Sequence, residues 1–248
     1  MTTASTDVTD HALGFLLDVD NTLLDNDALK DYLARQLQQA LGASGAERFW
    51  QLYEVVRKER DVVDLPLTAQ RYAEGSGDLA ALATLTGIYD SIPFARFVYP
   101  HAIETLQHLE TLGLATILSD GDLVFQRQKI ERSGIAAAVN DRVLIYTHKQ
   151  QHLTEVAAYQ PADRSVIVDD KAAILHDVKS LLGEKVTTVH VRQGHYARDP
   201  LPTGFQADIT VDAIGDLRGL SAQDFLRSGL DDGNASTTSL SSGTDPER

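Results

Sequence analysis

The chain has 248 residues, of which 43% are hydrophobic and 23% are charged, a composition typical of a globular protein of one or two domains. It contains no cysteine, which excludes disulfides, thiolate metal sites and a cysteine nucleophile. The formal net charge of −14 argues against binding to nucleic acid or to an anionic membrane surface. A small phosphorylated ligand is still compatible with this charge, because a metal ion or one lysine can reverse the sign inside a pocket.

The sequence shows neither a signal-peptide pattern at its start nor a membrane-spanning stretch. The first ten residues have no basic start and no apolar run, so we expect no signal peptide. No stretch approaches the ~20 apolar residues of a membrane-spanning helix, and we therefore expect a cytoplasmic protein. Residues 1–12 and 229–248 are rich in Ser, Thr, Gly and Asp, and we expect both segments to be disordered.

The first predicted element is a strand over residues 13–17, a short apolar run of the kind buried on both faces of a sheet. The following stretch, residues 26–92, repeats apolar residues at helical spacing and shows no strand pattern. We therefore expect an all-helical insertion after the first strand.

From residue 100 onward, strand and helix patterns alternate. Strands are expected at 114–118, 142–146, 165–168, 185–191 and 208–211, and helices at about 103–112, 122–132, 149–159 and 172–182. This alternation predicts an α/β protein with a Rossmann-like, mainly parallel sheet and helices on both faces. The expected core comprises residues 13–25 and 93–228, with the helical insertion at 26–92.

Polar side chains follow four of the predicted strands. They are Asp18 and Asp20, Ser119 and Asp120, Thr147 to Lys149, and Asp169 with Asp170. The carboxyl ends of parallel strands share one edge of a sheet, so these side chains should face one crevice. Carboxylates at close range repel one another, and a hard divalent cation such as Mg²⁺ would relieve that repulsion. A lysine beside them could hold the remaining charge of a phosphoryl group.

A single aspartate at a strand end also has a structural explanation, because it often caps a turn or the next helix. Four such positions in this order are poorly explained by capping alone. The pattern therefore favours a reactive site over a set of independent caps.

The residues Asp18-Val-Asp-Asn-Thr22, preceded by the apolar strand, resemble the first motif, Asp-x-Asp-x-Thr, of the haloacid dehalogenase-like (HAD) hydrolase superfamily. Ser119 matches the second motif, Lys149 the third, and the pair 169–170 the two-carboxylate form of the fourth. The resemblance spans about residues 13–191 and implies a phosphatase-type member with a helical cap.

The resemblance implies a role for each motif residue. Asp18 would be the nucleophile that forms an aspartyl-phosphate, and Asp20 would act as general acid and then as general base. Ser119 and the backbone N–H of Asp120 would bind phosphoryl oxygens, and Lys149 would neutralise the nucleophile and the phosphoryl group.

The resemblance also implies a Mg²⁺ site. Its expected ligands are Asp18, Asp20 through its backbone carbonyl, Asp169 and Asp170. Asp170 is the preferred direct ligand. Asp169 is expected to contact the ion through a water molecule or to hydrogen-bond a group that binds it, and the reverse assignment is left open.

Several nearby residues depart from the pattern or have no predicted role. Gln150 follows Lys149, where many relatives have proline, and Lys129 lies within a helix, which makes it a poorer substitute for Lys149. Lys171 is expected to face solvent. His148 and His152 flank Lys149, but we do not expect them to bind a transition metal.

The insertion at 26–92 corresponds in this superfamily to a mobile cap, which favours a small phosphorylated metabolite as substrate. Its aromatic and arginine side chains are expected to be mostly core or solvated: Tyr32, Trp50, Tyr53, Arg57, Arg60, Arg71 and Tyr72. Residues 192–196 either line the mouth of the pocket or form a plain surface loop.

The leading hypothesis is a Mg²⁺-dependent phosphatase acting on a small phosphate ester. A phosphomutase with the same aspartyl-phosphate is the first alternative. A 2-haloacid dehalogenase is less favoured, because such enzymes resemble this fold but lack the second aspartate, Asp20. A binding-only member and a receiver-like switch are further alternatives, and the oligomeric state stays open.

Overall fold

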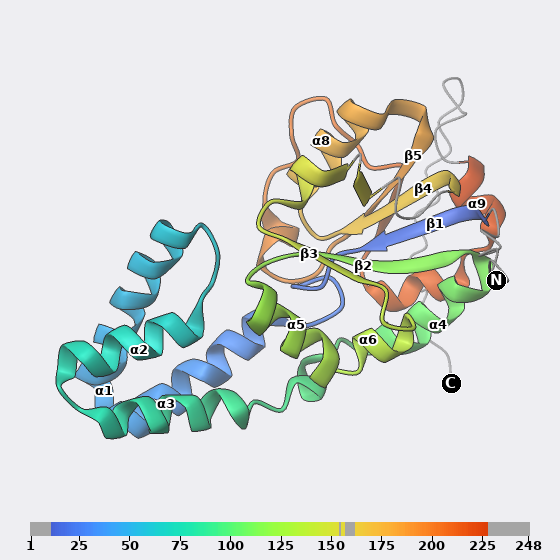
Figure 1. Cartoon of the computed structure of the whole chain (residues 1–248). Coiled ribbons are helices and arrows are strands. Elements are labelled where there is room, and N and C mark those ends of the chain that lie inside the picture. The colour runs from blue at the N-terminus through green and yellow to red at the C-terminus, as the bar shows by residue number, and fades with distance from the viewer. Residues whose placement is uncertain (1–10, 154, 157–161, 228–248) are drawn as a thin grey trace, which may run out of the picture.

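The computed structural model describes residues 11–153, 155–156 and 162–227 (Figure 1). Within these residues six strands form one sheet in the order β3-β2-β1-β4-β5-β6, and each neighbouring pair is parallel. The strands are β1 (His11–Leu17), β2 (Leu114–Asp120), β3 (Val143–Tyr146), β4 (Ala162–Asp169), β5 (Val186–Val191) and β6 (Ile209–Val211). The predicted parallel sheet is confirmed, and β1 begins two residues earlier than its apolar run suggested.

Helices cover both faces of this sheet. They are α4 (Ala102–Leu112), α5 (Leu123–Arg132), α6 (Ile135–Ala138), α8 (Ala172–Leu182) and α9 (Ala222–Arg227). Short 3₁₀ helices complete the connections: η1 (Phe94–Phe97), η2 (Lys149–His152), η3 (Gly183–Lys185), η4 (His195–Arg198) and η5 (Ile214–Gly219). The helix expected at 149–159 begins as η2, and residues 154 and 157–161 lie outside the described part.

The core has two parts, one on each face of the sheet. In β1, Phe15 and Leu17 point to the face covered by α4, α5 and α9, whereas Leu16 packs with Leu175 of α8 on the other face. Successive side chains of a strand point to opposite faces, so a strand in the middle of a covered sheet needs an apolar residue at every position. This explains why the sequence shows a continuous apolar run there.

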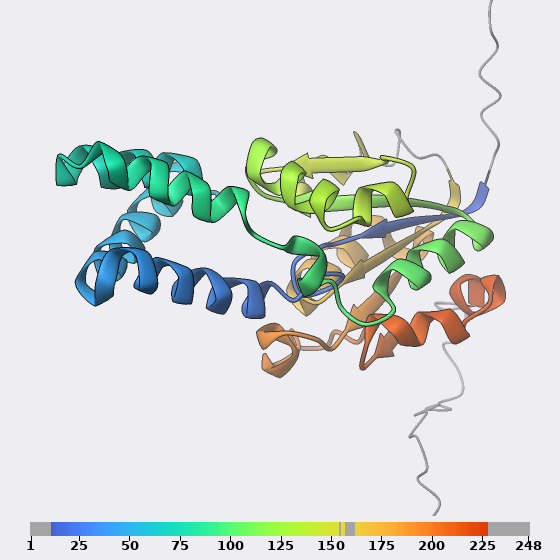
Figure 2. The same ribbon diagram turned by 90° about the horizontal axis from the view of Figure 1, so that it is seen from below.

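Three helices follow β1 and form a separate helical body, the helical insertion: α1 (Asn26–Arg60), α2 (Leu65–Ser76) and α3 (Leu79–Asp90). Figures 1 and 2 show this insertion extending away from the sheet. Asp25 caps the start of α1, because its Oδ1 accepts a hydrogen bond of 2.8 Å from the Ala28 N–H. Gly42, at φ 71° and ψ 174°, interrupts α1 and divides it into two helical segments.

The two segments that connect the insertion to the sheet lie side by side. Leu24 and Val98 form an antiparallel bridge, and the Asp25 N–H donates to the Phe97 carbonyl at 2.7 Å. The Tyr99 N–H donates to the Leu23 carbonyl at 2.9 Å. These contacts place the insertion next to the carboxyl end of β1.

Of the segments expected to be disordered, 1–12 and 229–248, all but residues 11 and 12 lie outside the described part; those two belong to β1, which pairs with β4 from His11 onward. Among the described helices, none is both long and apolar enough to cross a bilayer.

Candidate active site

Three carboxylates meet at the carboxyl ends of β1 and β4. Asp18 is 5% exposed, Asp169 and Asp170 are fully buried, and one oxygen of each lies within 4.8 Å of the others. The Asp18 N–H donates to the Val168 carbonyl at 3.0 Å, which extends the β1–β4 ladder and fixes the backbone of Asp18. Among the described residues, Asp18 Oδ2 and both oxygens of Asp170 have no hydrogen-bond partner. Buried carboxylate oxygens without donors are a natural ligand set for a hard cation.

Lys149 is the cation of this cluster. Its Nζ lies 2.5 Å from Asp18 Oδ1 and 2.7 Å from Asp169 Oδ2, and the side chain is 3% exposed. Its backbone N–H donates to Asp120 Oδ1 at 2.7 Å, so the strand end of β2 holds the segment that carries this lysine. Burial alone would lower the pKa of Lys149, but the carboxylates of Asp169 and Asp18 outweigh burial and raise its pKa.

Burial raises the pKa values of two carboxylates in this cluster, Asp18 and Asp170. Burial raises the pKa of Asp18 to about 6, although Lys149 opposes that rise. Burial, followed by the negative charges of Asp18 and Asp169, raises the pKa of Asp170 to about 9. A divalent cation would reverse both shifts, because it stabilises the charged form of each ligand.

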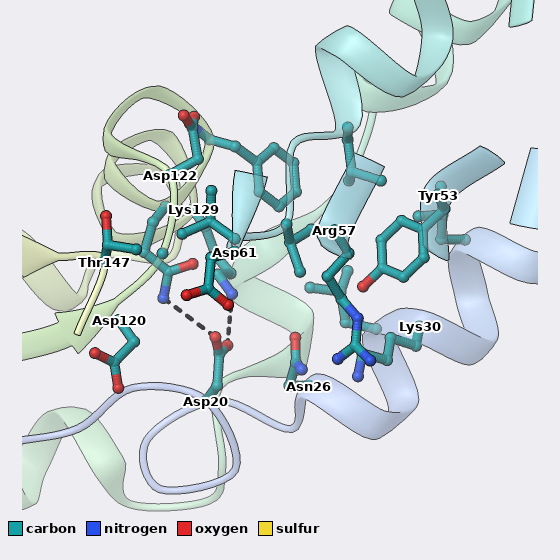
Figure 3. A pocket seen from close by; sticks show the side chains of 18 of the residues that line it. Asp20, Asn26, Lys30, Tyr53, Arg57, Asp61, Asp120, Asp122, Lys129 and Thr147 are labelled. Carbon is teal, nitrogen blue, oxygen red and sulfur yellow. Dashed lines mark hydrogen bonds and ion pairs between the residues drawn. The ribbon is translucent and has the colours of Figure 1, made fainter. Parts of the chain in front are cut away.

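Asp20 lies apart from these three carboxylates and faces a cavity (Figure 3). Its Oδ1 lies 2.5 Å from Lys129 Nζ, and its Oδ2 accepts a 3.2 Å hydrogen bond from Gln126 Nε2. The same Gln126 Nε2 donates to Ser119 Oγ at 2.8 Å. Two side chains of α5 therefore hold the carboxylate of Asp20 and the hydroxyl of Ser119 in one network.

Lys129 and Gln126 are the site residues that the sequence did not identify. The sequence suggests for Lys129 only the role of a poorer substitute for Lys149. In the structure Lys129 is buried and pairs with Asp20 instead. The signal was present, because two polar residues three positions apart share one face of a helix that begins beside a strand end. Gly121 leaves room for the Gln126 side chain beside Ser119 and Asp20. A Cβ at position 121 would lie 3.1 Å from two side-chain atoms of Gln126, and the φ of Gly121, +154°, is one that residues with a side chain rarely adopt.

A cavity of about 470 Å³ lies between the helical insertion and this edge of the sheet. The sheet side contributes Asp20, Asp120, Gln126, Lys129, Thr147 and Lys171, and the insertion contributes Trp50, Tyr53 and Arg57 among others. Lys171 thus differs from the expectation of a solvent-facing side chain: it lines the cavity, with its Nζ 5.0 Å from the centre of the Tyr196 ring.

The other aromatic and arginine candidates of the insertion have ordinary contacts. Tyr32 packs against Phe97, and Tyr72 packs against Phe49. Arg60 and Arg71 form ion pairs with acidic side chains within the insertion.

The histidines beside Lys149 do not converge on a common point. His148 Nε2 lies 2.6 Å from Asp61 Oδ2 at the end of α1, and His152 stacks on Tyr146 at 4.2 Å. Among the described residues, the triad of Asp18, Asp169 and Asp170 is the one cluster with metal-ligand geometry.

Residues 192–196 do not line the cavity. Arg192 pairs with Asp212, and His195 Nδ1 lies 2.7 Å from Asp27 Oδ1 in the first turn of α1. The His195 N–H also donates to Asp27 Oδ2 at 2.9 Å. This loop therefore contacts the base of the insertion.

No family model and no curated protein sequence matches the chain. Solved structures do match. A protein described as a haloacid dehalogenase-like hydrolase from Burkholderia xenovorans is 42% identical, with a TM-score of 0.78 over 86% of this chain and 98% of that chain.

Two further solved structures show the fold at lower identity. The HAD-hydrolase YfnB from Bacillus subtilis, bound to magnesium, is 12% identical with a TM-score of 0.58 over 85% of this chain and 98% of that chain. An L-2-haloacid dehalogenase from Xanthobacter autotrophicus is 20% identical with a TM-score of 0.51, over 83% of this chain and 96% of that chain. The parallel sheet, the strand-end aspartates and the extensive likeness to the Burkholderia protein agree, and the chain belongs to the haloacid dehalogenase-like hydrolases.

Proposed function

We propose that this hydrolase is a Mg²⁺-dependent phosphatase that cleaves a small phosphorylated metabolite through an aspartyl-phosphate. The observation that carries the proposal is Asp20, a second carboxylate two residues after Asp18 that faces the cavity. An alcohol leaving group needs a proton, whereas a halide leaving group does not. A positioned carboxylate at this place therefore supports cleavage of a phosphate ester.

The metal part of the proposal rests on the buried triad. Asp18 Oδ2 and both oxygens of Asp170 lack donors among the residues that the structure describes, and Asp169 is adjacent, so these residues fit a hard cation. The magnesium bound to the related hydrolase YfnB gives additional support. When bound, Mg²⁺ would supply positive charge to the phosphoryl oxygens and to the nucleophile.

The protein residues would act in two steps. An oxygen of Asp18 attacks phosphorus and the ester P–O bond breaks, while Asp20, which must enter this step protonated, gives its proton to the departing oxygen. Asp20 then takes a proton from the water that attacks the aspartyl-phosphate, which releases inorganic phosphate and restores Asp18. Lys149 would neutralise charge on Asp18, and Ser119 with the backbone N–H of Asp120 would bind phosphoryl oxygens.

The test is release of inorganic phosphate from a panel of phosphorylated metabolites and an aryl phosphate, with Mg²⁺ and with chelator. We expect metal-dependent release by the native chain and a loss of at least about a thousandfold in Asp18→Asn, because the nucleophile is removed. Chloride release from a 2-chloroacid without phosphate release would overturn the proposal in favour of a dehalogenase. Accumulation of a water-stable phosphoenzyme would instead favour a phosphomutase.

A further inference from the structure

The cavity between the insertion and the sheet is lined by Asp20 and Asp120 on the sheet side and by a group of cations on the insertion side. Lys30, Arg57 and Lys58, all from α1, line the cavity on the insertion side. Figure 3 shows the tips of the Arg57 and Lys30 side chains close together, across the cavity from Asp120. A cluster of three cations is a local reversal of charge in a chain whose formal net charge is −14.

Among the described residues, none of the carboxylates that line the same cavity forms an ion pair with these cations, and each is held by another group. Asp20 pairs with Lys129, and Asp61 pairs with His148. Asp120 accepts a hydrogen bond from the Lys149 N–H, and Asp122 accepts two from the first turn of α5.

The cations themselves are largely unpaired. Within the described residues, no ion pair or hydrogen bond involves the side chain of Lys30 or Lys58. Arg57 pairs with Glu54 at 3.2 Å, one turn away on the same helix, where both side chains are about half exposed. Exposed pairs of this kind contribute little, so Arg57 is available to a stronger anionic partner.

Apolar side chains also line the cavity. They come from the insertion and from the sheet side: Leu29, Leu33, Trp50, Ile92 and Phe125. A ligand in the cavity can therefore contact Asp20 and Asp120 of the sheet side, apolar side chains, and the cations of the insertion.

We infer that the substrate carries a second anionic group, a carboxylate or a second phosphate, that binds to Arg57 and Lys30 while the phosphoryl group lies at Asp18. This inference rests on the proposed phosphatase function, since it assigns the phosphoryl group to the sheet end. Charge-assisted contacts to two cations would favour a doubly anionic ligand over its singly anionic analogue by about tenfold or more.

The test is a binding comparison that does not require turnover. Alkane-1,ω-diphosphonates of increasing chain length are compared with the ω-hydroxyalkylphosphonates of the same length, in the presence of Mg²⁺. Neither series contains a hydrolysable ester. Dissociation constants are measured by calorimetry and by the fluorescence of Trp50, which lines the cavity and is the single tryptophan of the sequence.

We expect the diphosphonate of at least one length to bind about tenfold or more tightly than its hydroxyalkyl analogue. Arg57→Gln and Lys30→Gln should each reduce this ratio severalfold. Arg60→Gln is the matched control, because Arg60 lies on the same helix, carries the same charge and does not line the cavity. Each ratio is taken within one variant, so a partial loss of folded protein does not alter it.

Equal affinity at every length, no binding of either series, or an equal loss in Arg60→Gln would overturn the inference. Failure of the proposed function is distinguished by phosphate release from simple monoesters, which does not depend on the second anion. If the chain hydrolyses monoesters but does not prefer diphosphonates, the phosphatase proposal stands and this inference is wrong. If the chain prefers diphosphonates but cleaves no phosphate ester, the preference for a second anion stands and the phosphatase proposal is wrong.

Discussion

At the scale of single residues, the contact between Lys129 and Asp20 is the least expected feature of the site. Burying an ammonium group is costly unless a carboxylate accompanies it, and Lys129 is 3% exposed. The carboxylate of Asp20 supplies that partner at 2.5 Å, and Gln126 holds its second oxygen. The result is a carboxylate with a fixed orientation toward the cavity, which is what a proton-transferring group needs.

Replacing Lys129 with methionine tests this positioning role, because the methionine keeps the length and apolar body of lysine and removes the ammonium. We expect kcat to fall by about tenfold to a hundredfold with a smaller change in KM, since Asp20 loses its orientation. Steady-state kinetics on the best ester measures both values. Lys185→Met at an exposed position is the control. Unchanged kcat in Lys129→Met would mean that the ion pair only stabilises the fold.

The raised pKa of Asp170, about 9, predicts that metal binding is coupled to proton release. At pH 7 the metal-free group holds a proton, and a metal ligand must be a carboxylate, so Mg²⁺ and the proton compete. Affinity for Mg²⁺ should therefore rise as the pH rises toward 9 and fall as the pH is lowered. Calorimetry in buffers of different ionisation enthalpy should detect about one proton released per Mg²⁺ at pH 7. Binding without proton release would place the metal away from Asp170.

At the scale of elements, α1 joins the two halves of the cavity. Its first turn lies beside the carboxyl end of β1, and its last turns carry Arg57 and Lys58. Gly42 divides the helix. Its backbone angles, φ 71° and ψ 174°, fall in a region that residues other than glycine rarely adopt. This glycine therefore determines how the second half of α1 returns along the insertion.

Gly42→Ala should destabilise the protein by about 1–3 kcal/mol, although no atom lies within 4 Å of the added Cβ, because the cost is conformational. Gly87→Ala is the matched control: Gly87 lies inside α3, has no atom within 4 Å of its added Cβ, and is not at positive φ. We expect that variant to be more stable by about 0.5–1 kcal/mol. Urea unfolding of both variants measures the two changes, and equal effects would mean that Gly42 does not hold the described conformation.

At the scale of the whole molecule, a cation bound at the buried triad would couple folding to metal binding. Asp18 and the pair 169–170 come from distant parts of the chain and meet in the folded sheet. An unfolded chain offers no such cluster, so a cation that binds it stabilises the native state.

Mg²⁺ should raise the midpoint of thermal unfolding by about 5–10 °C at a hundredfold excess over its dissociation constant. Differential scanning calorimetry with matched ionic strength of NaCl separates this effect from general charge screening. Asp170→Asn should show little or no shift. The same shift in both chains would place the stabilising ion at another site.

Much of the fold and of the site was predictable from the sequence. The apolar run before Asp18 identified a central strand, because a strand covered on both faces needs an apolar residue at each position. The polar residues after that strand and after the strands ending near 119 and 169 could be placed at one edge, since parallel strands end on the same side. Lys149 and Asp18 do lie together, at 2.5 Å.

Other parts depended on the tertiary structure alone. The sequence placed Lys129 in a helix, but only the packing of α5 against β3 and η1 turns that lysine toward Asp20. Arg57 of α1 was likewise expected to be core or solvated, and only the return of the insertion over the sheet edge makes it line a cavity with Lys30 and Lys58. The ends of strands can be predicted from local patterns of two or three residues. A contact between a helix and a distant strand depends on how the two elements pack, and a local sequence pattern does not predict that packing.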